Sequence, residues 1–131
     1  MSTEERRQAG DLANQAGQFV MNRDLIALRR SSGALSATGG IHRVQTHNAD
    51  RVVAWRRDGG GSNEEFVVVS NFASQDRPGY PVKLPPGQWR EVFNTNARLY
   101  GGTGAGNGGG LVDSASGVYL PAGSTVILQR T

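Results

Sequence analysis

From Ile41 to the end of the chain, short apolar runs alternate with polar residues at a period of two, and turn-forming residues separate the runs. A period of two places alternate side chains on opposite faces of a strand, whereas a helix requires a period near 3.6. Nineteen of the 131 residues are glycine, which favours turns and loops over a helical bundle. The sequence therefore predicts an all-β fold, an antiparallel β-sandwich with Greek-key-like connections.

Seven segments carry the strand pattern, and most are bounded by glycine, proline, asparagine or aspartate. They are residues 41–47, 51–57, 66–72, 80–84, 88–93, 117–120 and 125–130. The 66–72 run begins apolar on both faces, which predicts a central strand. The 80–84 run is predicted at a sheet edge, because its proline lacks the N–H group that a sheet ladder requires.

One α-helix is predicted ahead of the strands. Met21, Leu25 and Leu28 recur at helical spacing, and Gly33 follows as the predicted C-terminal cap. The helical pattern extends over residues 4–31, but Gly10 and Gly17 weaken its earlier part by about 1 kcal/mol each relative to alanine. The chain is therefore predicted to divide into three parts. These are an N-terminal segment 1–17 that is frayed or disordered, a helix 18–33 and a β-sandwich domain 34–131.

The net charge is +3, and Lys83 is the only lysine. The arginines are scattered and several have an acidic neighbour, so nucleic-acid binding is a disfavoured alternative. The chain has no cysteine, which excludes disulfides and fits the reducing cytoplasm. The first residues contain no apolar signal-peptide core, and no apolar run approaches membrane-spanning length. A cytoplasmic protein without membrane contact is expected.

No residue pattern predicts a catalytic, cofactor or metal site. Residues 104–109 match G-x-G-x-x-G, but Leu111 begins no helix that could hold a phosphate. His42 and His47 are an odd number of positions apart and are expected on opposite faces of one strand. Glu91 has no carboxylate partner for glycosidase chemistry and is expected at the surface. The chain is predicted to be non-catalytic, with no cofactor and no metal.

Two aromatic residues are candidates for carbohydrate contact. The apolar face of a pyranose stacks on a flat aromatic ring, which excludes water from both surfaces. Trp89 follows the turn 85–87, and Tyr100 stands at the lip of the glycine-rich loop 101–110. Both rings could instead fill the core. A starch- or glycogen-binding module that uses these rings is therefore one functional alternative.

Four motifs resemble the closing β-domain of α-amylase-superfamily enzymes, the α-glucan branching enzymes above all. The motifs are R-D-L-I-A-L-R-R at 23–30, V-V-V-S-N-F at 67–72, W-R-E-V-F-N-T-N-A-R-L-Y-G-G at 89–102 and V-Y-L-P-A at 118–122. They follow the order of that family over residues 18–131. Asn94 matches an asparagine of the family pattern, whereas Asn96 and Ala73 stand where the pattern has aspartate and serine.

The resemblance implies a β-sandwich that packs against a catalytic barrel and stabilises it. The helix would be the last helix of that barrel, so its apolar face would need a cover. That cover would be the sandwich, a second copy of the chain in a homodimer, or a separate catalytic chain. The catalytic carboxylates of the family match no position here, and 131 residues leave no room for a barrel.

The resemblance draws attention to one loop. Its residues of interest are Asn94, Asn96, Gly101 and Gly102. The expected function is that of a non-catalytic domain in α-glucan metabolism, of starch or glycogen, which stabilises or docks onto a catalytic barrel. A stand-alone glucan-binding module and a basic nucleic-acid-binding domain are the alternatives.

Overall fold

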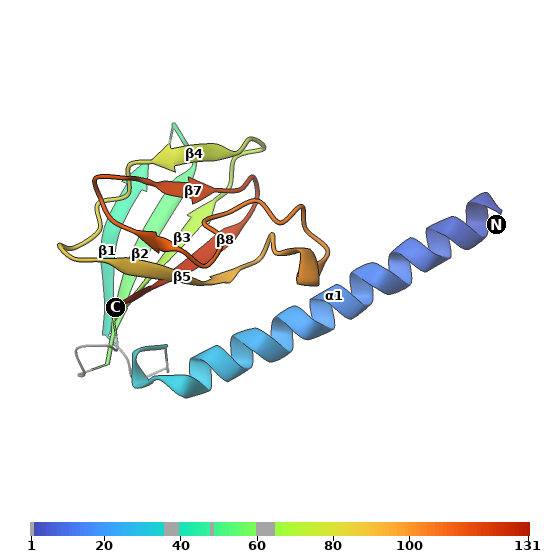
Figure 1. Ribbon diagram of the computed structural model, residues 1–131, viewed down its shortest axis with the longest axis horizontal. Coiled ribbons are helices and arrows are strands. Elements are labelled where there is room, and N and C mark those ends of the chain that lie inside the picture. Colours follow the sequence, from blue (N-terminus) through green and yellow to red (C-terminus); the bar gives the residue numbers. More distant parts are fainter. Residues whose placement is uncertain (1, 36–39, 48, 60–64) are drawn as a thin grey trace.

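The computed structural model describes residues 2–35, 40–47, 49–59 and 65–131. Within these residues one long helix precedes eight strands, and two 3-10 helices lie in the connections (Figure 1). The elements are α1 (Thr3–Ser31), η1 (Gly33–Leu35), β1 (Gly40–His47), β2 (Val52–Asp58), β3 (Glu65–Asn71), β4 (Arg77–Tyr80), β5 (Trp89–Asn94), η2 (Arg98–Tyr100), β6 (Leu111–Val112), β7 (Val118–Leu120) and β8 (Thr125–Arg130).

The described strands form two antiparallel sheets. The large sheet has the order β1-β2-β3-β8-β5-β6, and the small sheet pairs β4 with β7. The two sheets share one apolar core, and α1 lies on the other side of the large sheet (Figure 1). The predicted all-β fold, an antiparallel sandwich preceded by a helix, is confirmed.

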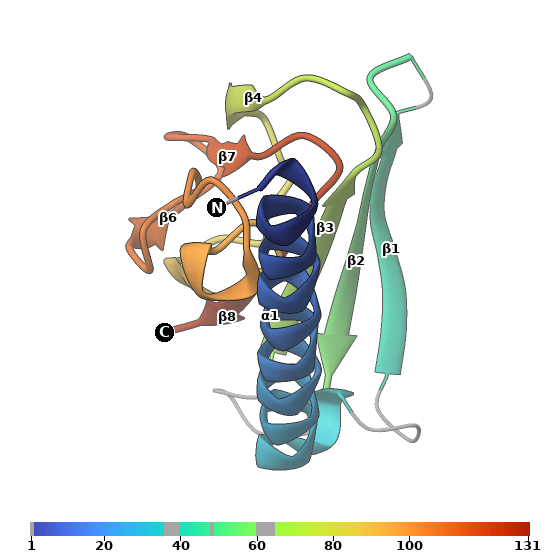
Figure 2. The same ribbon diagram turned by 90° about the vertical axis from the view of Figure 1, so that its right-hand side faces the viewer.

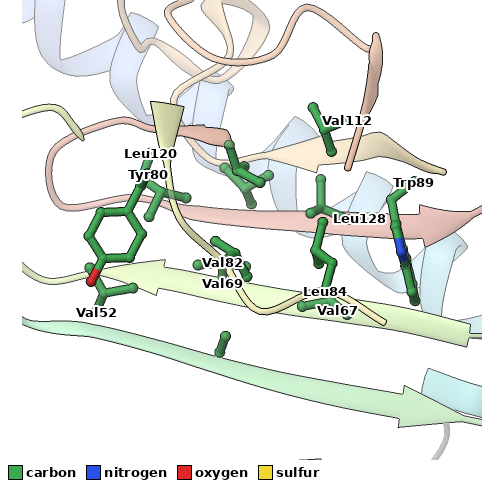
Figure 3. Close-up of a cluster of buried hydrophobic side chains, with 13 residues drawn as sticks. Val52, Val67, Val69, Tyr80, Val82, Leu84, Trp89, Val112, Leu120 and Leu128 are labelled. Atoms are coloured by element: carbon green, nitrogen blue, oxygen red, sulfur yellow. The ribbon is translucent and has the colours of Figure 1, made fainter. Parts of the chain in front are cut away.

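The larger core fills the space between the two sheets (Figure 3). Alternate residues of the large sheet point into it, as a half-buried strand requires. It comprises Val52, Ala54, Val67, Val69, Tyr80, Val82, Leu84, Trp89, Val112, Val118, Leu120, Val126 and Leu128. Full burial of a valine or leucine side chain contributes about 1.5–3 kcal/mol, so this core is the main source of stability.

A second core lies on the opposite face of the large sheet. It comprises Ala34, Leu35, Phe66, Phe93 and Ile127. Met21 and Leu28 of α1 pack against it. Because β3 and β8 contribute to both cores, they are buried on both faces. The prediction that the 66–72 run is a central strand is therefore confirmed.

The helix α1 spans Thr3–Ser31, close to the helical pattern predicted over residues 4–31. Its N-terminal cap is Ser2, whose Oγ accepts a hydrogen bond of 3.1 Å from the N–H of Glu5. The N-terminal part of α1 projects beyond the sandwich (Figure 1). At the other end the C-terminal cap is Ser32, not the predicted Gly33. The division of the chain into parts at residues 17 and 33 stays a prediction.

Two strands differ from the predicted set. The strand predicted at 80–84 is wrong beyond its first residue, because β4 spans Arg77–Tyr80, where it pairs with β7. Beyond it, the N–H of Val82 donates to the carbonyl of Tyr80, and that of Leu84 donates to the carbonyl of Val82. These tight local bonds take the backbone out of the sheet while both side chains stay buried. The two-residue strand β6 follows a glycine run and is too short to show alternation.

A β-bulge in β1 changes the faces of the two histidines. The register of β1 against β2 shifts within residues 43–45, so His42 and His47 point to the same side of the sheet. The prediction of opposite faces is wrong, because it assumed unbroken alternation. The Nε2 atom of His42 lies 3.0 Å from a carboxylate oxygen of Asp58, and the Nδ1 atom of His47 lies 3.0 Å from one of Asp50.

Asn71, buried at the end of β3, joins the two sheets. Its Nδ2 lies within hydrogen-bond distance of the carbonyl oxygens of Gln75 (3.1 Å), Leu120 (3.2 Å) and Pro121 (3.2 Å). Its Oδ1 accepts a hydrogen bond of 3.0 Å from the N–H of Ala73. One amide therefore satisfies several buried main-chain groups that would otherwise be left without partners.

Replacing Asn71 by aspartate keeps the shape of the side chain and removes both N–H donors. It also places a carboxylate against main-chain carbonyl oxygens. We expect Asn71→Asp to lower the free energy of unfolding by about 2–3 kcal/mol, measured by urea denaturation. Asn22→Asp, at an exposed position of α1, is the matched control and should change it by less than about 0.5 kcal/mol. Equal effects would contradict the joining role of Asn71.

Candidate functional site

The loop between β5 and β6 is closed by the side chains of two asparagines. Asn94 donates from Nδ2 to the carbonyl of Ala105 (3.0 Å) and accepts at Oδ1 from the N–H of Asn96 (2.8 Å). Asn96 donates from Nδ2 to the hydroxyl of Thr103 (2.7 Å) and accepts at Oδ1 from the N–H of Thr103 (3.2 Å). The side chains of both asparagines therefore hold the loop closed through hydrogen bonds to its own residues.

Gly101 and Gly102 are required by the backbone of this loop. Gly101 ends η2 with a φ of 90°, in the left-handed region that disfavours other residues. A Cβ atom at Gly102 would lie 2.2 Å from the carbonyl oxygen of Asn96. The two glycines that the resemblance singled out thus allow a tight turn and a close approach of two backbone segments.

Glu91 is buried beneath the glycine-rich loop, so the prediction of a surface position is wrong. Its Oε1 accepts from the N–H of Asn107 (3.3 Å), and its Oε2 accepts from the N–H of Gly109 (3.1 Å). The covering segment folds back from further along the chain, so strand alternation could not reveal it. Main-chain N–H groups of the G-x-G-x-x-G segment therefore bind the carboxylate of Glu91, and the segment is followed by the strand β6, not by a helix.

Trp89 lies in the core between the sheets (Figure 3). Its side chain is fully buried. The indole Nε1 donates to the carbonyl of Pro85 (3.1 Å), and the guanidinium of Arg130 lies 4.6 Å from the ring centroid. The ring offers no free face to a sugar in this structure, because every part of it is covered.

Tyr100 joins the loop to α1. Its hydroxyl donates a hydrogen bond of 2.7 Å to Asp24, and its ring centroid lies 5.5 Å from that of Phe93. At Gly17 the helix approaches so closely that a Cβ atom would lie 2.8 Å from the carbonyl carbon and oxygen of Tyr100. Burial and the bond to the Asp24 carboxylate raise the pKa of Tyr100 to about 12. Carbohydrate contact by Trp89 or Tyr100 stays a prediction.

The outer face of α1 carries an apolar groove of about 390 Å³. The groove is lined by Phe19, Asn22, Arg23, Ile26, Ala27 and Arg30. Phe19 is 70% exposed, and Ile26 is also exposed. Met21 and Leu28, on another side of the same helix, pack against the sandwich. The helix therefore has one apolar side that the sandwich covers and one that is open.

Several arginines lie in ion pairs rather than in a basic cluster. The pairs are Arg23 with Asp24 (3.4 Å), Arg56 with Asp58 (3.5 Å) and Glu65 (3.6 Å), Arg77 with Asp50 (3.7 Å), and Arg130 with Glu65 (3.1 Å). Polyanion binding depends on unpaired clustered cations, so this pairing does not favour it.

The described part of the chain contains no group of three or more histidine, aspartate or glutamate residues that could hold a metal ion. Within the same residues, no helix is both long enough and apolar enough to span a bilayer.

The strands, the closed loop and the buried aromatic and carboxylate groups define an all-β domain, to which α1 adds an open apolar groove. Residues 42–131 match the family model described as "Alpha amylase, C-terminal all-beta domain". The chain belongs to this family, and the resemblance predicted from its motifs is confirmed.

Similar proteins include two enzymes named 1,4-alpha-glucan branching enzyme GlgB. The enzyme of Roseobacter denitrificans is 43% identical over 91% of this chain, and that of Mesorhizobium japonicum is 36% identical over 91%. The alignment covers 18% of each relative, so the chain spans less than a fifth of their length. The solved structure of trehalulose synthase MutB from Pseudomonas mesoacidophila MX-45 matches with a TM-score of 0.57 and 25% identity, over 83% of this chain and 17% of that one.

Replacing Tyr100 by phenylalanine removes the hydroxyl that binds Asp24 and keeps the ring. At neutral pH we expect Tyr100→Phe to lower the free energy of unfolding by about 1 kcal/mol. The pKa of about 12 in the folded chain lies above the usual 10.0, so the protonated phenol stabilises the fold fully below pH 10. This contribution is lost as the pH rises from 10 to about 12. Urea denaturation across that range should show a smaller loss in the variant, and parallel losses would contradict the assignment.

Proposed function

We propose that this chain is the non-catalytic β-domain of an α-glucan-active enzyme of the branching type. In this proposal it packs against the catalytic barrel of that enzyme through the outer groove of α1. The open groove is the observation that carries the proposal. An exposed apolar groove is unfavourable in water until a partner covers it, and large exposed apolar patches are typical of interaction surfaces.

The relatives support the glucan part of the proposal. Two of them are named 1,4-alpha-glucan branching enzymes, and the chain aligns with 18% of each. In an enzyme of that length, the remaining part of the chain would offer this domain a large surface for packing. A cytoplasmic location belongs to the same proposal, since the chain has no cysteine.

The attachment of α1 to the sandwich supports docking through a helix with a defined orientation. The hydrogen bond between Tyr100 and Asp24 and the close approach at Gly17 hold its middle. Met21 and Leu28 pack against the second core nearer its C-terminal end. A groove on a helix held at several points is presented in one direction, which lowers the ordering entropy lost on docking. In this proposal the domain packs against the barrel and stabilises it.

The proposal is tested in a fusion, in which this chain replaces the matching segment of the Roseobacter denitrificans branching enzyme. Phe19→Asp places a carboxylate in the groove. Phe72→Asp is the matched control, because Phe72 is 67% exposed and lies outside the groove. We expect only Phe19→Asp to weaken the attachment of the domain, by about 2–3 kcal/mol, because a charge would be buried in an apolar contact. The readouts are the midpoint of thermal unfolding and the rate of proteolytic release of the domain.

In the isolated chain both variants should change the free energy of unfolding by less than about 0.5 kcal/mol, because both side chains are exposed there. Equal effects of the two variants on the fusion would contradict docking through the groove.

A further inference from the structure

Among the described residues, α1 and η1 cover only part of the large-sheet face against which they pack. α1 and η1 lie over its middle, where Phe66, Phe93 and Ile127 are buried. β1 and β2 extend the same sheet to one side of α1 (Figure 2). On these two strands Trp55 is 41% exposed and Ile41 is 60% exposed.

The strand register places both side chains on the helix side of the sheet. Trp55 lies opposite Val68 of β3, and Ile41 lies opposite Arg57, which in turn lies opposite Phe66. Residues directly opposite one another in antiparallel strands point to the same face. Phe66 belongs to the second core, and Val68 packs against it. Trp55 and Ile41 therefore continue that core outward to the open edge of the sheet.

The other face of β2 is covered where it lies against the small sheet. Val52 and Ala54 are fully buried there under the small sheet. On β2, Trp55 is therefore exposed on the face opposite Val52 and Ala54, whereas the adjacent β3 has buried residues on both faces, Val67 on one and Phe66 on the other. Arg43 lies opposite Trp55 and is exposed, so it adds a cation beside the indole. An aromatic ring with a neighbouring arginine is the composition typical of the energetic centre of a protein interface.

We propose that Ile41, Arg43 and Trp55 form a second contact surface, called here the sheet patch, for the same catalytic barrel that covers the groove of α1. This inference rests on the proposed function. The barrel would contact the outer face of the helix and, beside it, the sheet patch. Because a helix with its side chains is about 10 Å thick, the facing surface of the barrel must be stepped by that amount.

Two observations favour the barrel as the occupant of the sheet patch. The patch is continuous with the second core and lies on the same side of the sheet as α1. The relatives are also more than five times longer than the segment that aligns with this chain, which leaves ample surface for both contacts. The complementary surface is predicted to be apolar opposite the indole and acidic opposite Arg43.

The two tryptophans of the chain provide the test by hydroxyl-radical footprinting with mass spectrometry. Trp55 is exposed and Trp89 is fully buried, so Trp89 is an internal control. In the isolated chain we expect oxidation of Trp55 and protection of Trp89. In the fusion with the branching enzyme, the oxidation rate of Trp55 should fall several-fold while Trp89 stays protected.

The oxidation of Phe19 is measured in the same experiment, and it distinguishes failure of the inference from failure of the proposed function. Protection of both Phe19 and Trp55 in the fusion supports both. Protection of Phe19 with Trp55 oxidised as in the isolated chain overturns the inference and leaves the proposed function standing. Protection of neither overturns both. If the isolated chain forms a dimer that already protects Trp55, a second copy is the occupant and the inference is overturned.

A charge reversal tests the predicted acidic partner of Arg43. Arg43→Glu in the fusion should speed proteolytic release of the domain several-fold at low salt. Lys83→Glu is the control, because Lys83 is exposed and its N–H binds Gln45, which lies opposite Ala54 and so faces the other side of the sheet from the patch. Equal release rates for the two variants would overturn the role of Arg43.

Discussion

Burial of the two middle strands on both faces is the constraint on which the rest of the structure depends. β3 and β8 direct Val67 and Leu128 towards the small sheet, and Phe66 and Ile127 towards the helix. A strand that is apolar on both faces requires a covering layer on each side. The small sheet provides one layer, and η1 with the C-terminal half of α1 provides the other. The helix is therefore part of the folded domain, and the direction of its open groove follows from the packing of its covered side.

The sequence allowed prediction of those features whose signals are local. Alternation located most of the strands, and helical spacing located the covered side of α1. Trp89 occupies the core position that the sequence left open as an alternative, whereas burial of Glu91 could not be predicted, because the loop that covers it comes later in the chain. Gly17 looked like a position that weakens the helix, but its missing side chain allows the close approach to Tyr100. A glycine inside a predicted helix can therefore mark a packing contact.

Three residues of the family-like motifs lie where hydrogen bonds connect separate parts of the domain. Asn71 joins the two sheets, Asn94 closes the loop after β5, and Tyr100 joins that loop to α1. At each of these connections a polar side chain forms hydrogen bonds with main-chain or carboxylate atoms of the same chain. Such satisfied polar contacts specify one arrangement of the layers. The motifs therefore identify how the domain holds its shape, and the surfaces left for a partner are the groove and the sheet patch.

Native-state hydrogen exchange of α1 tests most directly whether the helix and the sandwich form one cooperative unit. The packing of residues 21–28 on the second core predicts that their amides exchange with the same free energy of opening as those of β3 and β8. The part of α1 that projects beyond the sandwich should exchange faster. Exchange of residues 21–28 through a much smaller opening free energy than that of β3 would contradict the account, because the helix would then move independently of the sheet.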